Sequence, residues 1–142
     1  AAERPSVPSF QLTSLEGQSF TEKEMLGKAT LVVFWASWCG TCQQELPKIH
    51  QLQKKLADRP FRVLAIGFSD TQQNIERYVR ENAKTFSFPV FYDRGDQVAG
   101  RFGAVATPTL FLFDQEGKLV VPYRGGGLLE HPQFHKILEE LL

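Results

Sequence analysis

The feature that most constrains the fold is a largely apolar run, ATLVVFW, at residues 29–35. The run is rich in β-branched and aromatic residues and lacks polar alternation, a pattern typical of a strand buried on both faces. A helical pattern follows it, because leucine and isoleucine recur at three- and four-residue steps from Leu46 to Leu56. The sequence therefore predicts a buried strand that passes into a helix beginning near Gly40.

The remainder of the chain alternates between strand-like and helix-like segments. We predict a strand over 61–68, a helix after Asp70, a short strand over 88–93, a helical turn over 96–103, a hairpin over 109–123 and an amphipathic helix over 132–142. Asp70 is the expected cap of the helix that follows it. Such an order indicates an α/β fold, with a central mixed β-sheet flanked by helices on both faces.

The first 28 residues predict a small extension of that sheet fold. The segment FQLTSLEGQSF has two short extended stretches around a turn at Glu16-Gly17, which is typical of a β-hairpin. Thr21 and Glu24 have the spacing of a capping box for a short helix that closes near Gly27. Residues 1–8 contain two prolines, and we expect them to form a flexible lead. No repeat or linker interrupts the chain, which predicts a single domain over 1–142.

Composition gives no sign of nucleic-acid or membrane chemistry. Lysine plus arginine equals aspartate plus glutamate at 16 each, so the formal net charge is zero and no nucleic-acid partner is expected. The longest apolar run, ATLVVFWASW, is far shorter than the roughly 20 residues that a spanning helix needs. The opening AAERPSVPSF fits what remains after a secretory signal or membrane anchor is removed. A membrane anchor outside this sequence is therefore an open expectation.

Both cysteines of the chain, Cys39 and Cys42, lie at the predicted junction of strand and helix. The first turn of a helix has unpaired N–H groups and the positive end of the helix dipole, which together stabilise a thiolate at Cys39. Cys42 lies one turn deeper on roughly the same face, within reach of a disulfide and more shielded. This arrangement predicts a two-step exchange. Cys39 attacks a partner's disulfide, and Cys42 then attacks Cys39 and releases the reduced partner.

Three other interpretations of the cysteine pair are less favoured. A structural disulfide of this spacing closes so small a loop that it removes little entropy from the unfolded chain. A zinc site needs four ligands, and His131 and His135 can add two to the cysteines. However, Pro132 between the histidines marks a helix start, and the histidines lie much further from the cysteines in sequence than in a zinc finger. Two inert buried thiols are the third interpretation. Redox chemistry remains the favoured hypothesis, with no metal.

The segment VVFWASWCGTCQQELPKI resembles the active-site segment of thioredoxin-fold proteins. It is most similar to that of the TlpA/ResA-type extracytoplasmic thiol-disulfide oxidoreductases, which include the reductants of cytochrome c maturation. PSFQLTSLEGQSFTEKEMLGKATLVVFWASWC is similar to the family's opening hairpin, short helix and first core strand. FGAVATPTLFLFDQEGKL is similar to its later portion, where a cis-proline precedes a strand that ends in a hairpin. The resemblance implies a thioredoxin-like fold with an N-terminal β-hairpin extension.

The same resemblance implies roles for individual residues. Trp38 is expected to flank the active-site surface and the groove that binds the partner, with a core position like that of Trp35 as the alternative. Thr107-Pro108 matches the cis-proline dipeptide that faces the disulfide and pairs with the partner's backbone. Glu45 matches the acidic residue of the CxxCxxE pattern, which implies that it tunes the thiols and relays protons to Cys42. The alternative for Glu45 is a solvated helix charge.

Three positions depart from related patterns. Val33 stands where thioredoxin itself has a buried aspartate, so that proton acceptor is missing. Gly40-Thr41 replaces thioredoxin's Gly-Pro, so the resemblance does not determine the reduction potential of this cysteine pair. Thr109 occupies the place where the apocytochrome-directed branch often carries glutamate, which argues against a dedicated role in haem maturation.

These observations favour a thiol-disulfide oxidoreductase that acts on protein thiols and disulfides and is served by an upstream electron donor. Its electrons would reside in the dithiol, so no metal or organic cofactor is expected. The resemblance implies an extracytoplasmic monomer, in the periplasm or on the outer face of a bacterial membrane, that works as a reductant. One alternative is a redox-inert binding module with a locked disulfide. The other is a peroxiredoxin-like peroxidase, which needs a threonine three residues before its cysteine, where this chain has Ala36.

Overall fold

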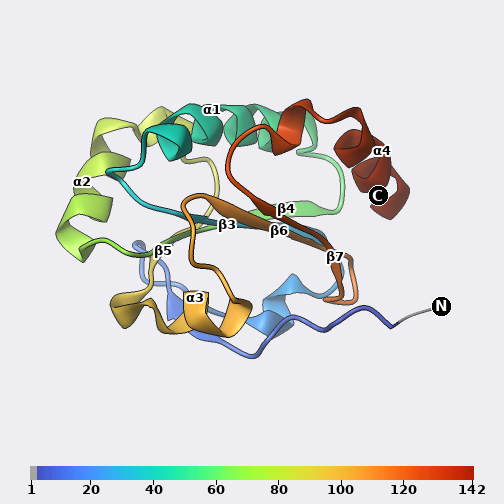
Figure 1. Ribbon diagram of the computed structural model, residues 1–142, viewed down its shortest axis with the longest axis horizontal. Helices are drawn as coiled ribbons and strands as arrows, with labels where there is room; N and C mark the ends of the chain where they lie inside the picture. The colour runs from blue at the N-terminus through green and yellow to red at the C-terminus, as the bar shows by residue number, and fades with distance from the viewer. Residues whose placement is uncertain (1–2) are drawn as a thin grey trace.

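The computed structural model describes residues 3–142. At its centre lies a five-stranded mixed sheet with the strand order β5-β4-β3-β6-β7 (Figure 1). The strands are β3 (Ala29–Trp35), β4 (Phe61–Gly67), β5 (Val90–Tyr92), β6 (Thr109–Phe113) and β7 (Leu119–Arg124). Strands β3, β4 and β5 run parallel, whereas β6 is antiparallel to β3 and β7 is antiparallel to β6. The predicted mixed sheet is confirmed.

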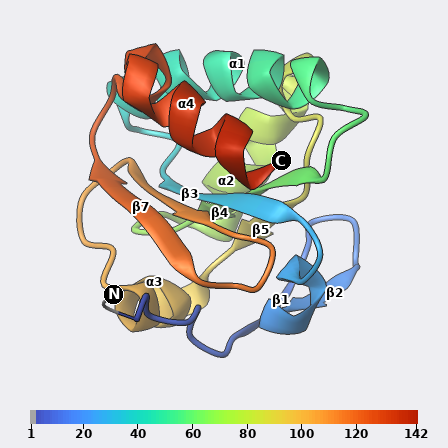
Figure 2. The same cartoon turned by 90° about the vertical axis from the view of Figure 1, so that its right-hand side faces the viewer.

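Helices cover both faces of this sheet. On one face lie α1 (Gly40–Lys55), α2 (Gln72–Glu81) and α4 (Pro132–Leu141) (Figures 1 and 2). On the other face lie α3 (Gln97–Phe102) and the predicted hairpin, formed by β1 (Gln11–Thr13) and β2 (Ser19–Thr21). Four short 3-10 helices occupy connections, at η1 (Glu22–Met25), η2 (Ala83–Thr85), η3 (Arg94–Asp96) and η4 (Leu128–Glu130). Within residues 3–142, every helix is too short or too polar to cross a membrane.

Strand β3 is the middle of the core, as its largely apolar run predicted. Successive side chains of a strand point to opposite faces of the sheet. Leu31, Val33 and Trp35 therefore enter the cluster beneath α1, α2 and α4, whereas Val32 and Phe34 enter the cluster on the α3 side. All seven residues of β3 are buried. The strand is thus packed from both faces, and its carboxyl end has little freedom to move.

The capping box predicted for the short helix after β2 is confirmed. The Thr21 hydroxyl accepts a hydrogen bond from the Lys23 amide at 3.2 Å, and the Glu24 carboxylate accepts one from the Thr21 amide at 2.7 Å. These two bonds satisfy amide groups that have no partner inside the first turn of a helix.

Part of the predicted flexible lead is hydrogen-bonded to the β6–β7 turn. The Leu119 amide donates to the Pro5 carbonyl and the Val7 amide donates to the Gly117 carbonyl, both at 2.8 Å. Ser6 and Lys118 form an isolated bridge between the same two segments. Residues 1 and 2 of the lead lie outside the described residues.

The prediction that Asp70 caps α2 is wrong. Thr71 is the N-cap, and its hydroxyl accepts a hydrogen bond from the Asn74 amide at 3.1 Å. Asp70 Oδ2 instead accepts hydrogen bonds from the amide and the hydroxyl of Ser37, at 2.7 and 2.6 Å. The carboxylate therefore ties the loop before α1 to the loop before α2, a contact between residues 33 positions apart that no local pattern predicts.

Candidate active site

The two cysteines lie where β3 passes into α1. Cys39 is the N-cap residue of α1, and its Sγ accepts a hydrogen bond from the Cys42 amide at 3.1 Å. The sulfur takes the place of the side-chain oxygen that usually accepts this bond at a helix start. The two thiols thus lie on the first turn of one helix, close to each other and to the positive end of its dipole.

The two thiols differ in their surroundings. Both are free, Cys39 is 6% exposed, and Cys42 is 1% exposed. Burial raises the pKa of the Cys42 thiol, and the neighbouring Cys39 side chain raises it further. Cys42 therefore stays protonated at neutral pH while the couple is reduced.

The Thr107-Pro108 peptide bond is cis and lies beside Cys39. The Cys39 thiol donates a hydrogen bond to the Thr107 carbonyl oxygen, with 3.6 Å between sulfur and oxygen. Pro108 itself is buried and lies directly before β6. The cis bond that the resemblance implied is confirmed, and it faces the outer of the two thiols.

Trp38 lies on the surface beside Cys39, unlike Trp35, which is fully buried. The Trp38 side chain is 60% exposed, and its Nε1 donates a hydrogen bond to the Ser69 carbonyl at 2.8 Å. Val105, which lies two residues before Thr107, is 77% exposed. An exposed apolar side chain next to a reactive thiol is typical of a surface that binds another molecule. Sequence reasoning missed Val105, because nothing in its local pattern separates an exposed valine from a buried one.

Asp70 is a further residue that supports the loop in front of Cys39. Burial acts to raise the pKa of its carboxyl, but hydrogen bonds from the side chain and amide of Ser37 outweigh it, and the pKa is lowered. Thr71 and Asn74 add hydrogen bonds to the other carboxylate oxygen. The charged carboxylate thus holds Ser37 in place, directly before the exposed Trp38.

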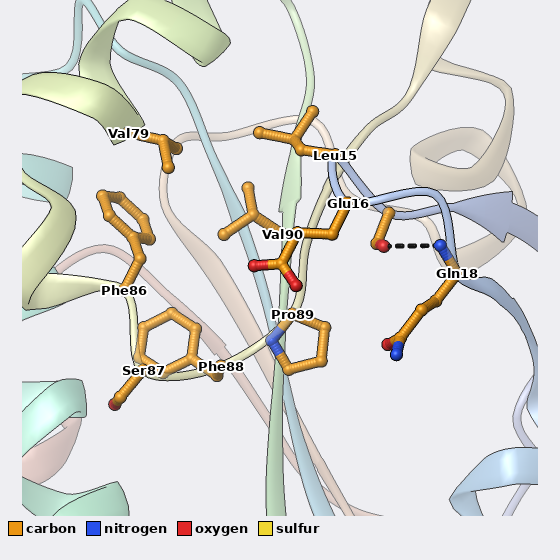
Figure 3. A pocket seen from close by; sticks show the side chains of 10 residues that line it. Leu15, Glu16, Gln18, Val79, Phe86, Ser87, Phe88, Pro89 and Val90 are labelled. Carbon is orange, nitrogen blue, oxygen red and sulfur yellow. Dashed lines mark hydrogen bonds between the residues drawn. The ribbon is translucent and has the colours of Figure 1, made fainter.

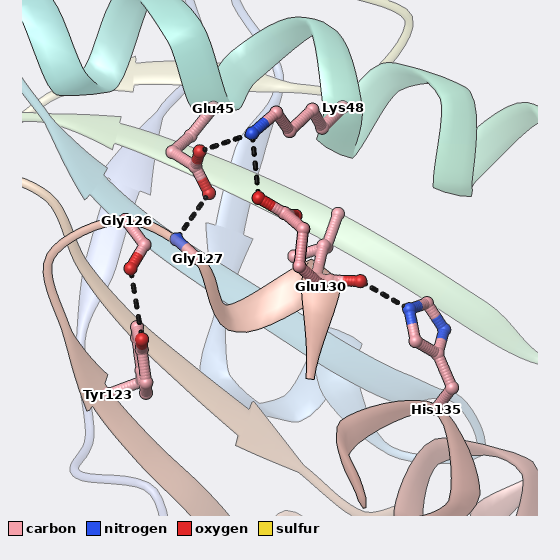
Figure 4. A network of polar contacts seen from close by, with 8 residues as sticks. Glu45, Lys48, Tyr123, Gly126, Gly127, Glu130 and His135 are labelled. Carbon is pink, nitrogen blue, oxygen red and sulfur yellow. Dashed lines mark hydrogen bonds and ion pairs between the residues drawn. The ribbon is translucent and has the colours of Figure 1, made fainter. Parts of the chain in front are cut away.

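Glu45 is buried, so the alternative of a solvated helix charge is wrong. Its side chain extends from α1 (Figure 4). The residue lies one turn after Cys42 and is 4% exposed. Its Oε1 accepts a hydrogen bond from the Gly127 amide at 3.1 Å, and its Oε2 pairs with Lys48 Nζ at 3.1 Å. Lys48 Nζ also pairs with Glu130 at 2.7 Å, and the two carboxylates, Glu130 first, raise the pKa of Lys48.

A pocket of about 420 Å³ lies away from the cysteines, at the β5 edge of the sheet. Its walls include Leu15 from the hairpin loop, Val79 from α2, and Phe86 and Phe88 from the segment before β5 (Figure 3). Phe86 packs on Trp35 with 5.4 Å between ring centroids. Neither cysteine lines this pocket, so it is separate from the thiol site.

The zinc alternative finds no support in the positions of the two histidines. His135 hydrogen-bonds to the Leu129 carbonyl, and His131 packs edge-on against Tyr123. Over residues 3–142 no group of three or more histidine, cysteine, aspartate or glutamate side chains is placed to hold a metal ion.

Comparison with known proteins agrees with this geometry. The sequence profile of the AhpC/TSA family matches residues 5–121, which is most of the chain. The chain belongs to the AhpC/TSA family. Among similar sequences, the thiol-disulfide oxidoreductase ResA of Bacillus thuringiensis (strain Al Hakam) is 33% identical over 114 residues, covering 80% of this chain and 65% of ResA. The thioredoxin-like protein YneN of Bacillus subtilis (strain 168) is 32% identical over 117 residues, covering 81% and 67%.

A solved structure confirms the fold of this AhpC/TSA chain. A candidate thiol:disulfide interchange protein DsbE from Chlorobium tepidum superposes with a TM-score of 0.88 over 99% of both chains, at 26% identity. The predicted thioredoxin-like fold and the resemblance to ResA-type proteins are therefore confirmed. The chain spans 65% of the length of the ResA sequence it matches.

Proposed function

We propose that this chain is a thiol-disulfide oxidoreductase of the ResA type, which exchanges a dithiol and a disulfide at Cys39 and Cys42 with protein partners. The hydrogen bond from the Cys42 amide to Cys39 Sγ, at 3.1 Å, carries the proposal. It places an amide donor on the sulfur that must become negative, and it keeps the second thiol within one helical turn. Names of relatives and of the similar structure agree with this activity.

In the forward direction the Cys39 thiolate attacks one sulfur of the partner's disulfide. The partner's S–S bond breaks, its other sulfur leaves as a thiolate and takes up a proton, and a mixed disulfide forms. Cys42 then loses its proton and attacks Cys39 Sγ. The Cys39–Cys42 disulfide forms, and the partner's remaining sulfur leaves and is protonated. Two electrons have passed from the dithiol to the partner, with no other cofactor.

The burial difference supports these separate roles. Cys42 is 1% exposed, and burial raises the pKa of its thiol, so it does not attack external disulfides. Glu45 is proposed to tune the couple and to relay the proton from Cys42, because it is a buried carboxylate one helical turn along α1. Trp38 and the Thr107-Pro108 segment are proposed to bind the partner, since the first is exposed and the second faces Cys39.

Direction and location are proposed from the resemblance to ResA-type proteins. We infer an extracytoplasmic reductant that works as a monomer and is recharged by an upstream electron donor. Cytochrome c maturation is the narrower role implied by the resemblance. Thr109 is buried at the place where that branch often carries glutamate, and its hydroxyl donates to the Ala106 carbonyl at 2.6 Å. We therefore propose protein disulfides as the substrate class, without restriction to apocytochromes.

A redox titration tests the proposal. The protein is equilibrated in glutathione or dithiothreitol buffers, quenched, and its two thiols are counted by alkylation and mass. We expect a single two-electron transition at a potential below about −200 mV, on the reducing side of protein disulfide isomerase. If no buffer reduces the Cys39–Cys42 disulfide, the chain is a redox-inert binding module. If the reduced protein rapidly consumes hydrogen peroxide, it is a peroxiredoxin-like peroxidase.

A further inference from the structure

The connection between β7 and η4 is a run of three glycines, Gly125–Gly127. Figure 4 shows its contact with Glu45 on α1. On one side, the Gly125 amide donates a hydrogen bond to the carbonyl of the cis-proline, Pro108, at 2.8 Å. On the other side, the Gly127 amide donates to Glu45 Oε1 on α1 at 3.1 Å. The loop therefore joins the cis-proline segment to the helix that carries the cysteines.

Gly126, in the middle of this loop, lies directly against Thr41, one of the two residues between the cysteines. A Cβ atom built on Gly126 would lie 2.9 Å from Thr41 Cγ2 and 3.5 Å from Glu45 Cδ. Side-chain carbons do not approach that closely, so Thr41 or the loop would have to move. The φ angle of Gly126 is outside the left-handed region. The missing side chain at Gly126 thus matters for the space beside Thr41 and not for backbone conformation.

The loop is held in place from three directions. The Tyr123 hydroxyl donates a hydrogen bond to the Gly126 carbonyl at 2.9 Å. The Gly125 and Gly127 amides hold its two ends through the Pro108 carbonyl and Glu45. Lys48 supports this arrangement indirectly, because it pairs with Glu45 on α1 at 3.1 Å and with Glu130 in η4 at 2.7 Å. Because the hydrogen bonds at Gly125, Gly126 and Gly127 each fix a different residue of the loop, a displaced loop cannot easily take up a new position that keeps all of them.

We propose that residues 125–127 act as a glycine clasp that holds the first turn of α1 against the cis-proline segment, and that Gly126 is a positioning residue for Cys39. The proposal rests on the function proposed above. Thr41 belongs to the same helical turn as the Cys42 amide, which donates to Cys39 Sγ. A side chain at Gly126 pushes Thr41, moves that turn, and so lengthens the hydrogen bond to the reactive sulfur.

The test compares Gly126→Ala with Thr41→Ser/Gly126→Ala, because serine lacks the Cγ2 atom that the new Cβ would strike. Alkylation of Cys39 by iodoacetamide at pH 7 is followed by mass on the reduced full chain, and the reduction potential is measured alongside. We expect Gly126→Ala to be alkylated about threefold more slowly than wild type, the size of a weakened helix-end interaction. The double variant is expected to react at the rate of Thr41→Ser alone. Its reduction potential is likewise expected to equal that of Thr41→Ser.

The matched control is Gly100→Ala, because a Cβ at Gly100 meets nothing within 4 Å and Gly100 lies in α3, away from both cysteines. It is expected to keep the wild-type alkylation rate and potential. Wild-type values in Gly126→Ala, or a slow rate that Thr41→Ser leaves unchanged, would overturn the proposal.

Two further measurements separate the possible failures. If Gly126→Ala does not fold, as thermal unfolding would show, Tyr123→Phe tests the clasp instead. It removes only the hydroxyl that holds Gly126 and is expected to slow alkylation about twofold. A wild-type rate in Tyr123→Phe would then overturn the clasp. If the wild type does not exchange disulfides with any protein but the alkylation pattern holds, the proposed function fails and the clasp stands.

Discussion

The amide of Cys42 donates a hydrogen bond to Cys39 Sγ across 3.1 Å, so the backbone of one thiol residue holds the sulfur of the other. This relationship follows from Cys39 being the N-cap of α1, where an acceptor is needed for the free amides of the first turn. It also gives the two sulfurs unequal surroundings, because Cys39 Sγ lies between the Cys42 amide and the Thr107 carbonyl, whereas burial raises the pKa of the Cys42 thiol. The predictions below depend on this inequality or on the contacts that maintain it.

Replacement of one cysteine at a time separates their roles. Cys42→Ser is expected to accumulate mixed disulfides with protein substrates, because the thiol that releases the partner is gone. Cys39→Ser is expected to trap none, since the buried Cys42 does not reach a partner's disulfide. Non-reducing gels of each variant, incubated with an oxidised protein such as insulin, show the adducts. Equal trapping by the two variants would contradict the assigned roles.

The stability of the reduced protein is expected to fall above pH 8.5. Burial raises the pKa of Cys42 in the folded state, whereas an unfolded cysteine ionises near pH 8.5. Below that pH both states are protonated and the contribution is fully present, and it is lost as pH rises because the unfolded thiol alone releases its proton. We expect a loss of about 1 kcal/mol in unfolding free energy between pH 8 and 9.5, measured in urea. Cys42→Ala is expected to lack this loss. If its unfolding free energy falls with pH as steeply as that of the wild type, the loss does not come from Cys42.

Loss of the Asp70 carboxylate is expected to loosen the loop before Cys39. Asp70→Asn weakens two hydrogen bonds from Ser37 and is expected to lower the unfolding free energy at pH 7 by about 1–3 kcal/mol. The pKa of Asp70 is lowered in the folded state, so this stability is present above about pH 4 and disappears as pH falls through the folded pKa. Urea unfolding at pH 3 and 7 checks this, with Asp58→Asn at an exposed site as the control. Equal losses in both variants would contradict it.

Truncation of Trp38 is expected to affect partner binding and not stability. Because the side chain is 60% exposed, Trp38→Ala is expected to change the unfolding free energy by about 0.5 kcal/mol or less. The KM for a protein disulfide is expected to rise about fivefold, while the rate with a small disulfide such as cystine stays near that of wild type. Steady-state kinetics with both substrates measure this. An equal loss on both substrates would place Trp38 in the chemistry and not in partner binding.

Two carboxylates that share Lys48 offer a matched comparison. Glu45 is buried and Glu130 is exposed, so Glu45→Gln is expected to lower the unfolding free energy by about 1–3 kcal/mol and Glu130→Gln by less than about 1 kcal/mol. Only Glu45→Gln is expected to shift the reduction potential, since only Glu45 lies one turn from Cys42. Urea unfolding and redox titration of both variants test this. A wild-type potential in Glu45→Gln would remove Glu45 from the tuning of the couple.

The sequence by itself determined the elements and the place of the thiols. The run from Ala29 to Trp35 was identified as a buried strand, the helix after it was identified from leucine spacing, and Thr21 and Glu24 marked a short helix. These signals are local, because hydrophobic period and capping chemistry involve residues within a few positions of each other. The positions of Cys39 and Cys42 at a helix start followed from the same local pattern.

Only the tertiary structure decided which side chains support the thiols. Asp70 was expected to cap its own helix but binds Ser37, 33 positions earlier, and Glu45 binds the amide of Gly127, 82 positions later. The Cys39 thiol and the Thr107 carbonyl are separated by 68 positions. Each contact forms because the strand order β4-β3-β6-β7 brings the ends of segments that are distant in the sequence to the same end of the sheet. A buried carboxylate accepts whichever donors the packed chain supplies, and that choice is not written in the neighbouring residues.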